Sequence, residues 1–452
     1  MKKSLISILS TILMFAVVFL GNMPVVAASN AETNFAERLN HILQNGTISD
    51  ALALFDTMPE NLKNDVDLRS LQASLLLSAG KTGDAEKIAS ELLSKQPKNI
   101  DVLLLNSMVA KQKKNSTKRL QFLNQIVALD PNNPEANIEL GNDQATKRKY
   151  KNARDYYLKA MKGDPKNVEA LFGHAKMSYY LHRDDDSKKS FNRILEIDPN
   201  NAPTYSYLAK FEAETRHFKK ATEYLSKAIS IEPDNSDYYL DLGNYHREAG
   251  KIDEAEKAWK KATELDPDYF LGYAYLAGLY DEQNKFDLAY DNYWKVVQKN
   301  PAYYYAYEAL GMIAWHNGNF SDSIKFFGSA YKANPENVSY ALMVAANYEK
   351  MKKHQECKAF TEKAMKGMDK NSFEYLSLRL FHDMTGDSAL TLKVQSEEKK
   401  KKKGKYLFYL ATYWDLKGKF DLAHKYYSEI TEIQGADFFE YRLAEWAQSP
   451  SE

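Results

Sequence analysis

Hydrophobic positions in this chain recur with helical spacing and are interrupted at regular intervals. In Ser236–Tyr269, large or apolar residues fall three or four positions apart before Gly250, and do so again from Ala255 to Ala262. Pro267 follows the second run, where a helix must end because proline lacks a backbone N–H and clashes with the preceding turn. This stretch therefore predicts a pair of amphipathic helices.

The same helix pair recurs along most of the chain. Eight of the 13 prolines lie 34 residues apart, at Pro97, Pro131, Pro165, Pro199, Pro233, Pro267, Pro301 and Pro335. Six of them are followed two residues later by an asparagine, whose side chain can accept a hydrogen bond from the first turn of the next helix. Twelve units follow this period, starting at Glu32, Val66, Ile100, Pro134, Val168, Ala202, Ser236, Phe270, Tyr304, Val338, Ser372 and Gly404. We interpret the chain as an array of repeats.

Two positions of each unit are small in ten of the twelve units. The eighth residue is Ala, Gly or Ser, and the twentieth is Ala, Ser or Cys. Small side chains at these positions would let two antiparallel helices approach closely, and a larger one would overfill the contact. The exceptions at the twentieth position are Arg119 and Thr391, and those at the eighth are Leu39 and Arg379.

This pattern resembles that of the tetratricopeptide repeat family. The residues that carry the resemblance are Tyr239, Leu242, Gly243, Ala255, Trp259, Ala262 and Pro267, with their equivalents in other units. The resemblance covers residues 32–437 and is weakest at 100–133 and 372–403. It implies an all-α fold, a right-handed α-solenoid of tetratricopeptide-type helix pairs, whose first helices line a concave groove. We expect the lysine-rich end of the eleventh unit to be a frayed helix or a loop.

The N-terminus has the features of a secretory signal. Two lysines precede the apolar run Leu5–Leu20, and small residues follow it. Residues 1–28 are the predicted signal peptide, with cleavage after Ala28 or, as second choice, after Ala31. An uncleaved anchor is the alternative, although the apolar run is short for a membrane span. We therefore expect an exported protein, periplasmic or secreted, without a lipid anchor, since Cys357 is the single cysteine.

Composition and motifs argue against several classes of function. Lys and Arg together number 61, as do Asp and Glu, so no charge excess favours nucleic-acid binding. The nine histidines have no metal-ligand spacing, and Cys357 occupies a small-residue position expected to be buried. Because no catalytic motif is present either, we expect no enzyme activity, cofactor or metal.

A groove for a partner is the remaining candidate site. If the family geometry holds, positions two, five, nine and twelve of each unit face this groove. The predicted partner-binding residues are Tyr305, Glu308, Met312, Trp315, Leu342, Phe373, Leu376 and Phe408. Such an apolar and aromatic stripe suits a partner helix or peptide, so we expect a protein–protein interaction scaffold of the envelope or secreted fraction. The alternative function is binding of a carbohydrate or cell-wall polymer in support of polysaccharide export or envelope assembly. It also stays open whether superhelical curvature buries part of the stripe against the chain itself.

Two further segments have candidate roles. The run Lys399–Lys405 predicts a solvated linker, or alternatively a peripheral contact with an anionic membrane or cell-wall polymer. Residues 438–452 are predicted to form a capping helix and tail, because the last repeat of an array needs its exposed apolar face covered.

Overall fold

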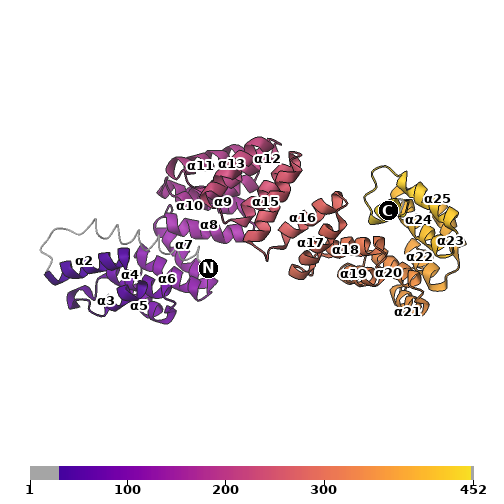
Figure 1. Cartoon of the computed structure of the whole chain (residues 1–452). Helices are drawn as coiled ribbons and strands as arrows, with labels where there is room; N and C mark the ends of the chain where they lie inside the picture. The colour runs from indigo at the N-terminus through magenta and orange to yellow at the C-terminus, as the bar shows by residue number, and fades with distance from the viewer. Residues whose placement is uncertain (1–29, 449–452) are drawn as a thin grey trace. The chain divides into compact units, whose positions relative to one another are not determined.

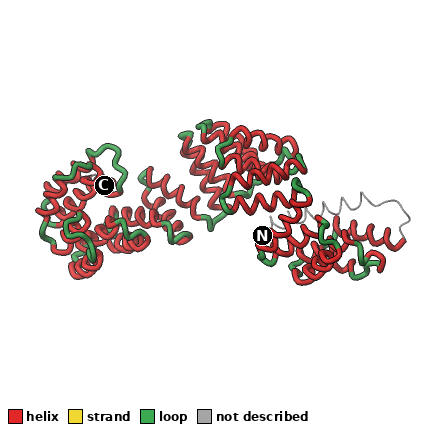
Figure 2. The backbone as a smooth tube through the Cα atoms, turned by 180° about the vertical axis from the view of Figure 1, so that it is seen from behind, coloured by secondary structure: helices red, strands yellow, loops and turns green. Residues whose placement is uncertain are grey.

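The computed structural model describes residues 30–448, so the predicted signal peptide lies outside the described residues. Every regular element in this part of the chain is helical, and residues 30–448 contain no strand (Figure 2). The all-α solenoid predicted from the repeat pattern is therefore confirmed.

The helices follow one another as antiparallel pairs (Figure 1). The chain starts with α2 (Asn30–Asn45), α3 (Ile48–Phe55) and a single 3-10 turn, Glu60–Leu62. The first helices of the later pairs are α4 (Val66–Ser78), α6 (Ile100–Gln112), α8 (Pro134–Thr146), α10 (Val168–Tyr180), α12 (Ala202–Glu214), α14 (Ser236–Glu248), α16 (Phe270–Glu282), α18 (Tyr304–His316), α20 (Val338–Lys350), α22 (Phe373–Asp383) and α24 (Lys400–Leu416). Their partners are α5 (Thr82–Lys95), α7 (Ser116–Leu129), α9 (Tyr150–Gly163), α11 (Asp184–Ile197), α13 (Phe218–Ile231), α15 (Ile252–Leu265), α17 (Phe286–Lys299), α19 (Phe320–Ala333), α21 (His354–Ala364), α23 (Asp387–Gln395) and α25 (Phe420–Thr431). The last helix is α26 (Phe439–Gln448).

The 34-residue period places the helix starts accurately. From α4 to α20, each first helix begins at the first residue of its predicted unit. Asparagine side chains cap four of these helices by accepting a backbone N–H bond, namely those of Asn99, Asn133, Asn167 and Asn201. Asn235 and Asn337 stand at the same position but form no such bond, so the capping prediction holds for four of the six.

The eleventh and twelfth units differ from the prediction. Helix α23 ends at Gln395 with Leu390 and Val394 buried, and the lysine run opens α24 instead of forming a linker. Helix α24 therefore begins at Lys400, four residues before the predicted unit start. Cations at a helix N-terminus are unfavourable, but here acids offset them: Lys401 pairs with Asp437 at 2.9 Å, Lys402 with Glu397 at 3.3 Å, and Lys403 with Glu429 at 2.6 Å.

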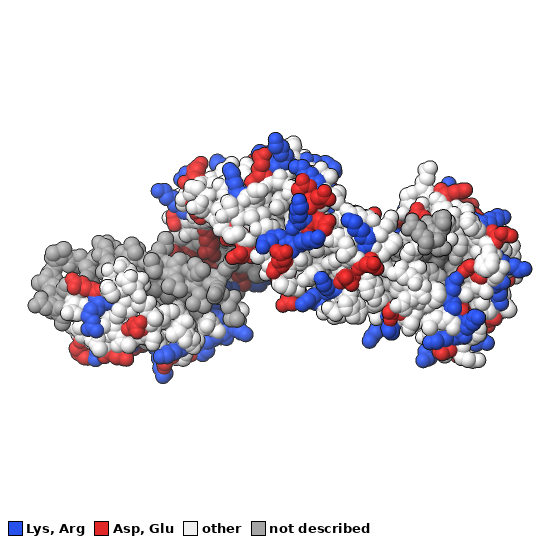
Figure 3. All heavy atoms as spheres, viewed as in Figure 1, with Lys and Arg blue, Asp and Glu red and all other residues white. Residues whose placement is uncertain are grey.

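The chain divides into two compact units, one up to Leu208 and one from Ala209 onward. Each unit has its core between successive helix pairs. The largest continuous core belongs to the second unit and contains side chains from α18 to α26. On the face shown in Figure 3, acidic and basic side chains are mixed, as the equal numbers of the two charges lead one to expect.

The small positions lie in the closest helix contacts. The alanines at the eighth and twentieth positions of the units are almost completely buried, for example Ala255 and Ala277. Where glycine stands at the eighth position, an aromatic ring of the paired helix fills the space. A Cβ built on Gly243 would lie 2.3 Å from Nε1 of Trp259, whose N–H donates to the Leu240 carbonyl at 3.2 Å. The Trp259 ring therefore fits only because residue 243 has no side chain.

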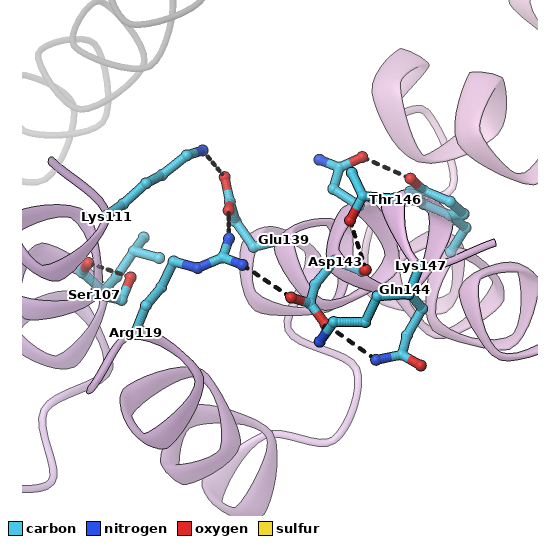
Figure 4. Close-up of polar contacts among 11 residues, drawn as sticks. Ser107, Lys111, Arg119, Glu139, Asp143, Gln144, Thr146 and Lys147 are labelled. Atoms are coloured by element: carbon cyan, nitrogen blue, oxygen red, sulfur yellow. Dashed lines mark hydrogen bonds and ion pairs between the residues drawn. The ribbon is translucent and has the colours of Figure 1, made fainter. Parts of the chain in front are cut away.

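Arg119, the exception at the twentieth position of its unit, is held by ion pairs (Figure 4). It extends from α7 to α8, where its guanidinium contacts Glu139 at 2.8 Å and Asp143 at 3.2 Å. Lys111 and Lys147 complete the network through the same two acids (Figure 4). A long side chain fits here because its charged end leaves the helix contact and is neutralised on the next pair.

The second unit curves tightly at its C-terminal end. First helices normally contact only those of neighbouring pairs, but α24 packs against α22 and also against α20, two pairs earlier (Figure 1). Lys350 of α20 forms an ion pair with Asp415 of α24, and the Tyr409 hydroxyl oxygen lies 3.2 Å from the Ser339 carbonyl oxygen. The inner wall is therefore partly closed on itself at this end.

We predict that Gly243→Ala destabilises the protein and that the matched change Gly278→Ala does not. The new methyl group at 243 would collide with Trp259, at a cost of roughly 1–3 kcal/mol. At Gly278, also in the first helix of a pair, no atom lies within 4 Å of the added Cβ, so alanine should stabilise its helix by about 0.5–1 kcal/mol. Thermal midpoints followed by circular dichroism test this, and equal midpoints for the two variants would contradict the packing assignment.

Candidate site on the inner wall of the second unit

The last helix, α26, lies against the inner wall of the second unit. It packs on α24 and α25, as the predicted cap should, but it also contacts α18. Leu443 and Ala444 are its buried residues in the common core. Helix α26 thus covers more than the last repeat, and its side chains show what this wall can bind.

The first anchor of α26 is aromatic. The ring of Phe439 lies 5.6 Å from that of Phe327 on α19 and is stacked at 6.0 Å on Tyr340 of α20. Such ring pairs add about 0.5–1.5 kcal/mol beyond the burial of area. The wall therefore offers a defined aromatic seat at this point.

The second anchor is a buried carboxylate. Glu440 is 1% exposed, and its Oε1 accepts hydrogen bonds from the Ser339 hydroxyl and, at 2.7 Å, from the Tyr409 hydroxyl. Its Oε2 is buried and has no hydrogen-bond partner within residues 30–448. Burial raises the pKa of this carboxyl, while the charge of Lys405 and the two hydroxyl bonds oppose the shift.

A second half-buried acid lies close to the first. Glu308 of α18 accepts a 2.5 Å hydrogen bond from the Tyr340 hydroxyl, and burial raises the pKa of Glu308 as well. The charge of Glu440 contributes to that increase, so the two carboxyls disfavour each other's ionised forms. This part of the wall therefore favours neutral acids over a pair of negative charges.

The third anchor combines an arginine and a tryptophan. Arg442 donates to the Asp281 carboxylate at 2.6 Å and to the Asp281 backbone carbonyl at 2.9 Å. Its guanidinium also lies 4.6 Å from the ring centroid of Trp446. Trp446 in turn contacts His316 at 4.6 Å and Phe286 at 5.1 Å. Asp281 is the twelfth residue of its unit, one of the positions expected to face the groove.

Four of the eight predicted partner-binding residues are buried. These are Met312, Leu342, Phe373 and Phe408. The expectation that they line an open groove is wrong for this structure, because the contact of α24 with α20 and the seating of α26 close the wall around them. Phe373, for example, is stacked on Tyr406 at 4.6 Å. The open alternative, that curvature buries part of the stripe, therefore holds at this end.

The other four predicted residues are at least partly accessible. Tyr305 is 56% exposed, and Glu308, Trp315 and Leu376 are half-buried. Tyr305 occupies the second position of its unit, the same position from which Ser339 binds Glu440 one repeat later. Binding of a partner by these four residues stays a prediction.

Sequence reasoning missed most of the residues that hold α26. Asp281, Phe286, His316, Phe327, Tyr340 and Tyr409 were not in the candidate set, although each contacts this helix. The signal in the sequence is the opposite charge of the two residues: Asp281 stands at a position expected to face the groove, and Arg442 lies in an amphipathic C-terminal segment. Only the curvature of the array, which the period does not encode, brings the two together.

Two further observations concern the described residues alone. Between residues 30 and 448, no group of three or more His, Cys, Asp or Glu side chains is placed to hold a metal ion. In the same range, none of the helices combines the length and the apolar character that crossing a bilayer requires.

Burial raises the pKa of the Cys357 thiol, which suits packing and not nucleophilic chemistry.

The repeat period, the small positions and the helix pairs define a tetratricopeptide repeat protein, and a tetratricopeptide repeat family model matches residues 276–338. The model of the family described as "N-terminal acetyltransferase A, auxiliary subunit" matches residues 38–272, which is more than half of the chain. The chain belongs to this family.

Individual relatives are distant. The mouse (Mus musculus) "Protein O-mannosyl-transferase TMTC1" is 23% identical over 158 residues, which are 34% of this chain. The match spans only 17% of the length of that relative.

Similar solved structures cover parts of the chain. "Crystal structure of MamA" is 25% identical, covers 36% of this chain and 94% of its own, and has a TM-score of 0.33. A tetratricopeptide repeat protein from Parabacteroides merdae is 19% identical, covers 53% and 94%, and has a TM-score of 0.39. Scores of this size support no argument about function.

We predict that Glu440 makes the docking of α26 depend on pH. Because burial raises its pKa above the ordinary glutamate value of 4.5, the docked helix binds the proton more tightly than the released one. The contribution to stability is complete below that value and is lost as pH rises through the raised pKa. Thermal midpoints of the native chain and of Glu440→Gln should therefore diverge with pH, the native chain losing stability relative to the variant. Parallel profiles would contradict the assignment.

Proposed function

We propose that this chain is a non-catalytic auxiliary protein that holds a protein partner on the inner wall of its solenoid, and that it works in the cell envelope or the secreted fraction. Membership in a family of auxiliary subunits supports the binding role. The observation that carries the proposal is the seat of α26, because this wall already holds an amphipathic helix through aromatic, acidic and basic anchors. Helix-in-groove recognition uses anchors of this kind.

The accessible groove positions are the proposed contact for the partner. Tyr305 is the most exposed of the predicted residues, and large aromatic side chains contribute most to binding interfaces. Its ring lies 4.2 Å from that of Tyr304, which limits its rotation. A rigid, exposed ring loses little entropy when a partner covers it.

A carbohydrate or cell-wall polymer is the second candidate ligand. The exposed ring of Tyr305 favours it, since a flat aromatic ring can stack on a sugar ring. Binding of purified glycan by the isolated chain, lost in Tyr305→Ala, would support this ligand over a protein.

The lysine run Lys399–Lys405 is the proposed peripheral contact with an anionic membrane or cell-wall polymer. Three of these lysines form ion pairs within the chain, which reduces the charge available to a membrane or wall polymer.

We predict that a photo-reactive residue at position 305 captures a protein in cells, whereas one at position 392 does not. Leu392 is the matched control, because it is 68% exposed but lies on α23, the second helix of its pair. With the captured protein in hand, Tyr305→Ala should weaken binding by about fivefold or more, as expected for loss of about 1 kcal/mol from an aromatic contact. Equal capture at both positions would place the binding surface elsewhere.

We also predict removal of the N-terminal segment during export. Mass spectrometry of the chain recovered outside the cytoplasm should find Ser29 as the first residue, or Glu32 if cleavage follows Ala31. Recovery of the chain in the cytoplasm with residue 1 intact would contradict the export proposal.

A further inference from the structure

Helix α26 presents an ordered set of anchors to the inner wall. In sequence they are an aromatic at 439, an acid at 440, an arginine at 442, an aliphatic residue at 443, a small one at 444 and a tryptophan at 446. Each of the two charged anchors has a partner of matching chemistry on the wall. Two hydroxyl groups bind the carboxylate, and Asp281 binds the arginine. Because both signs of charge are matched in fixed positions, the seat is specific for one helix orientation.

The resident helix does not satisfy this seat completely. Two buried carboxylate oxygens, Oε2 of Glu440 and Oδ1 of Asp281, have no hydrogen-bond partner in the described part of the chain. Leaving a buried polar atom unpaired costs the free energy of removing it from water. The docking of α26 is therefore weaker than its apolar contacts alone would make it.

The connection of α26 to the array is short and contains a glycine in the left-handed backbone region. Helix α25 stops at Thr431 and α26 starts at Phe439, and Gly435 between them has φ +66°. The Tyr441 hydroxyl donates back to the Thr431 carbonyl, at 3.2 Å. Asp437 in this connection pairs with Lys401 at 2.9 Å, and the Gln448 side chain of α26 donates to the Thr431 hydroxyl of α25 at 3.2 Å. Release of α26 therefore breaks these contacts in addition to those of the seat.

We propose that the α26 seat is a binding site for a helix of a partner protein that carries the same order of anchors, and that α26 is a tethered competitor for it. This inference rests on the proposed function and names its site and ligand class. The tether keeps α26 at an effective concentration in the millimolar range, so a partner helix must displace it. The competition sets a threshold on the affinity that a partner needs.

A synthetic, fluorescein-labelled peptide of residues 436–448 is the probe, and the full mature chain is the receptor. The double change Phe439→Ala and Arg442→Ala in the chain opens the seat, because it removes the aromatic anchor and the ion pair with Asp281. We expect the opened chain to bind the peptide at least tenfold more tightly than the native chain, by fluorescence anisotropy. Glu445→Gln, an exposed change on the same helix, is the control and should bind as the native chain does.

A charge exchange tests whether the peptide occupies the same seat. Asp281→Arg in the opened chain should abolish binding of the native peptide, and a peptide with Arg442→Asp should restore it. The restored binding also shows that the exchanged chain is folded. Failure of the opened chain to gain affinity, or of the exchanged peptide to bind, would overturn the inference.

Two other outcomes are separable. If the opened chain carrying Asp281→Arg forms mixed dimers with a chain carrying Arg442→Asp, seen by light scattering, the occupant is a second copy of this chain and the partner-helix proposal is wrong. If the peptide experiments succeed but position 305 captures no protein in cells, the seat stands while the proposed function fails.

Discussion

Close approach of paired helices at the small positions is the constraint on which the rest of the structure depends. An alanine, glycine or serine at the eighth position leaves room for a large side chain of the second helix, as Gly243 does for Trp259. The same kind of contact recurs wherever the small positions recur, as their burial shows. Where a unit departs from the rule, as at Arg119, the chain needs a network of ion pairs to place the larger side chain.

Regular stacking alone would leave an open wall, and the second unit shows how a modest change closes it. Because α24 contacts α20, the first helices of the last three pairs lie close together. Side chains that would otherwise face a groove are therefore buried in the core. The aromatic residues of this end, such as Phe408 and Tyr409, are then available to bury a further helix and not an external ligand. Helix α26 uses that surface, and burial there raises the pKa of its acid Glu440.

The polar anchors matter more for selectivity than for strength. Apolar contacts of Phe439, Leu443 and Trp446 would suit many amphipathic helices. The contact of Arg442 with Asp281 and that of Glu440 with two hydroxyls restrict the direction and register of the helix that fits. Burying these groups costs free energy where an oxygen remains unpaired, so specificity is obtained at the expense of stability.

The sequence by itself determined the class of fold, the first residue of the first helix in nine successive pairs and the burial of the small positions, because these are set by local spacing within one repeat. It also indicated an amphipathic C-terminal helix. The tertiary structure alone decided which wall residues are accessible. Tyr305 is exposed while Leu342 and Phe408 are buried, although all three occupy positions of their repeats that were expected to face the groove. Accessibility depends on curvature, which accumulates from small rotations between repeats and brings Asp281 and Arg442, 161 residues apart, into contact. No single repeat carries that information.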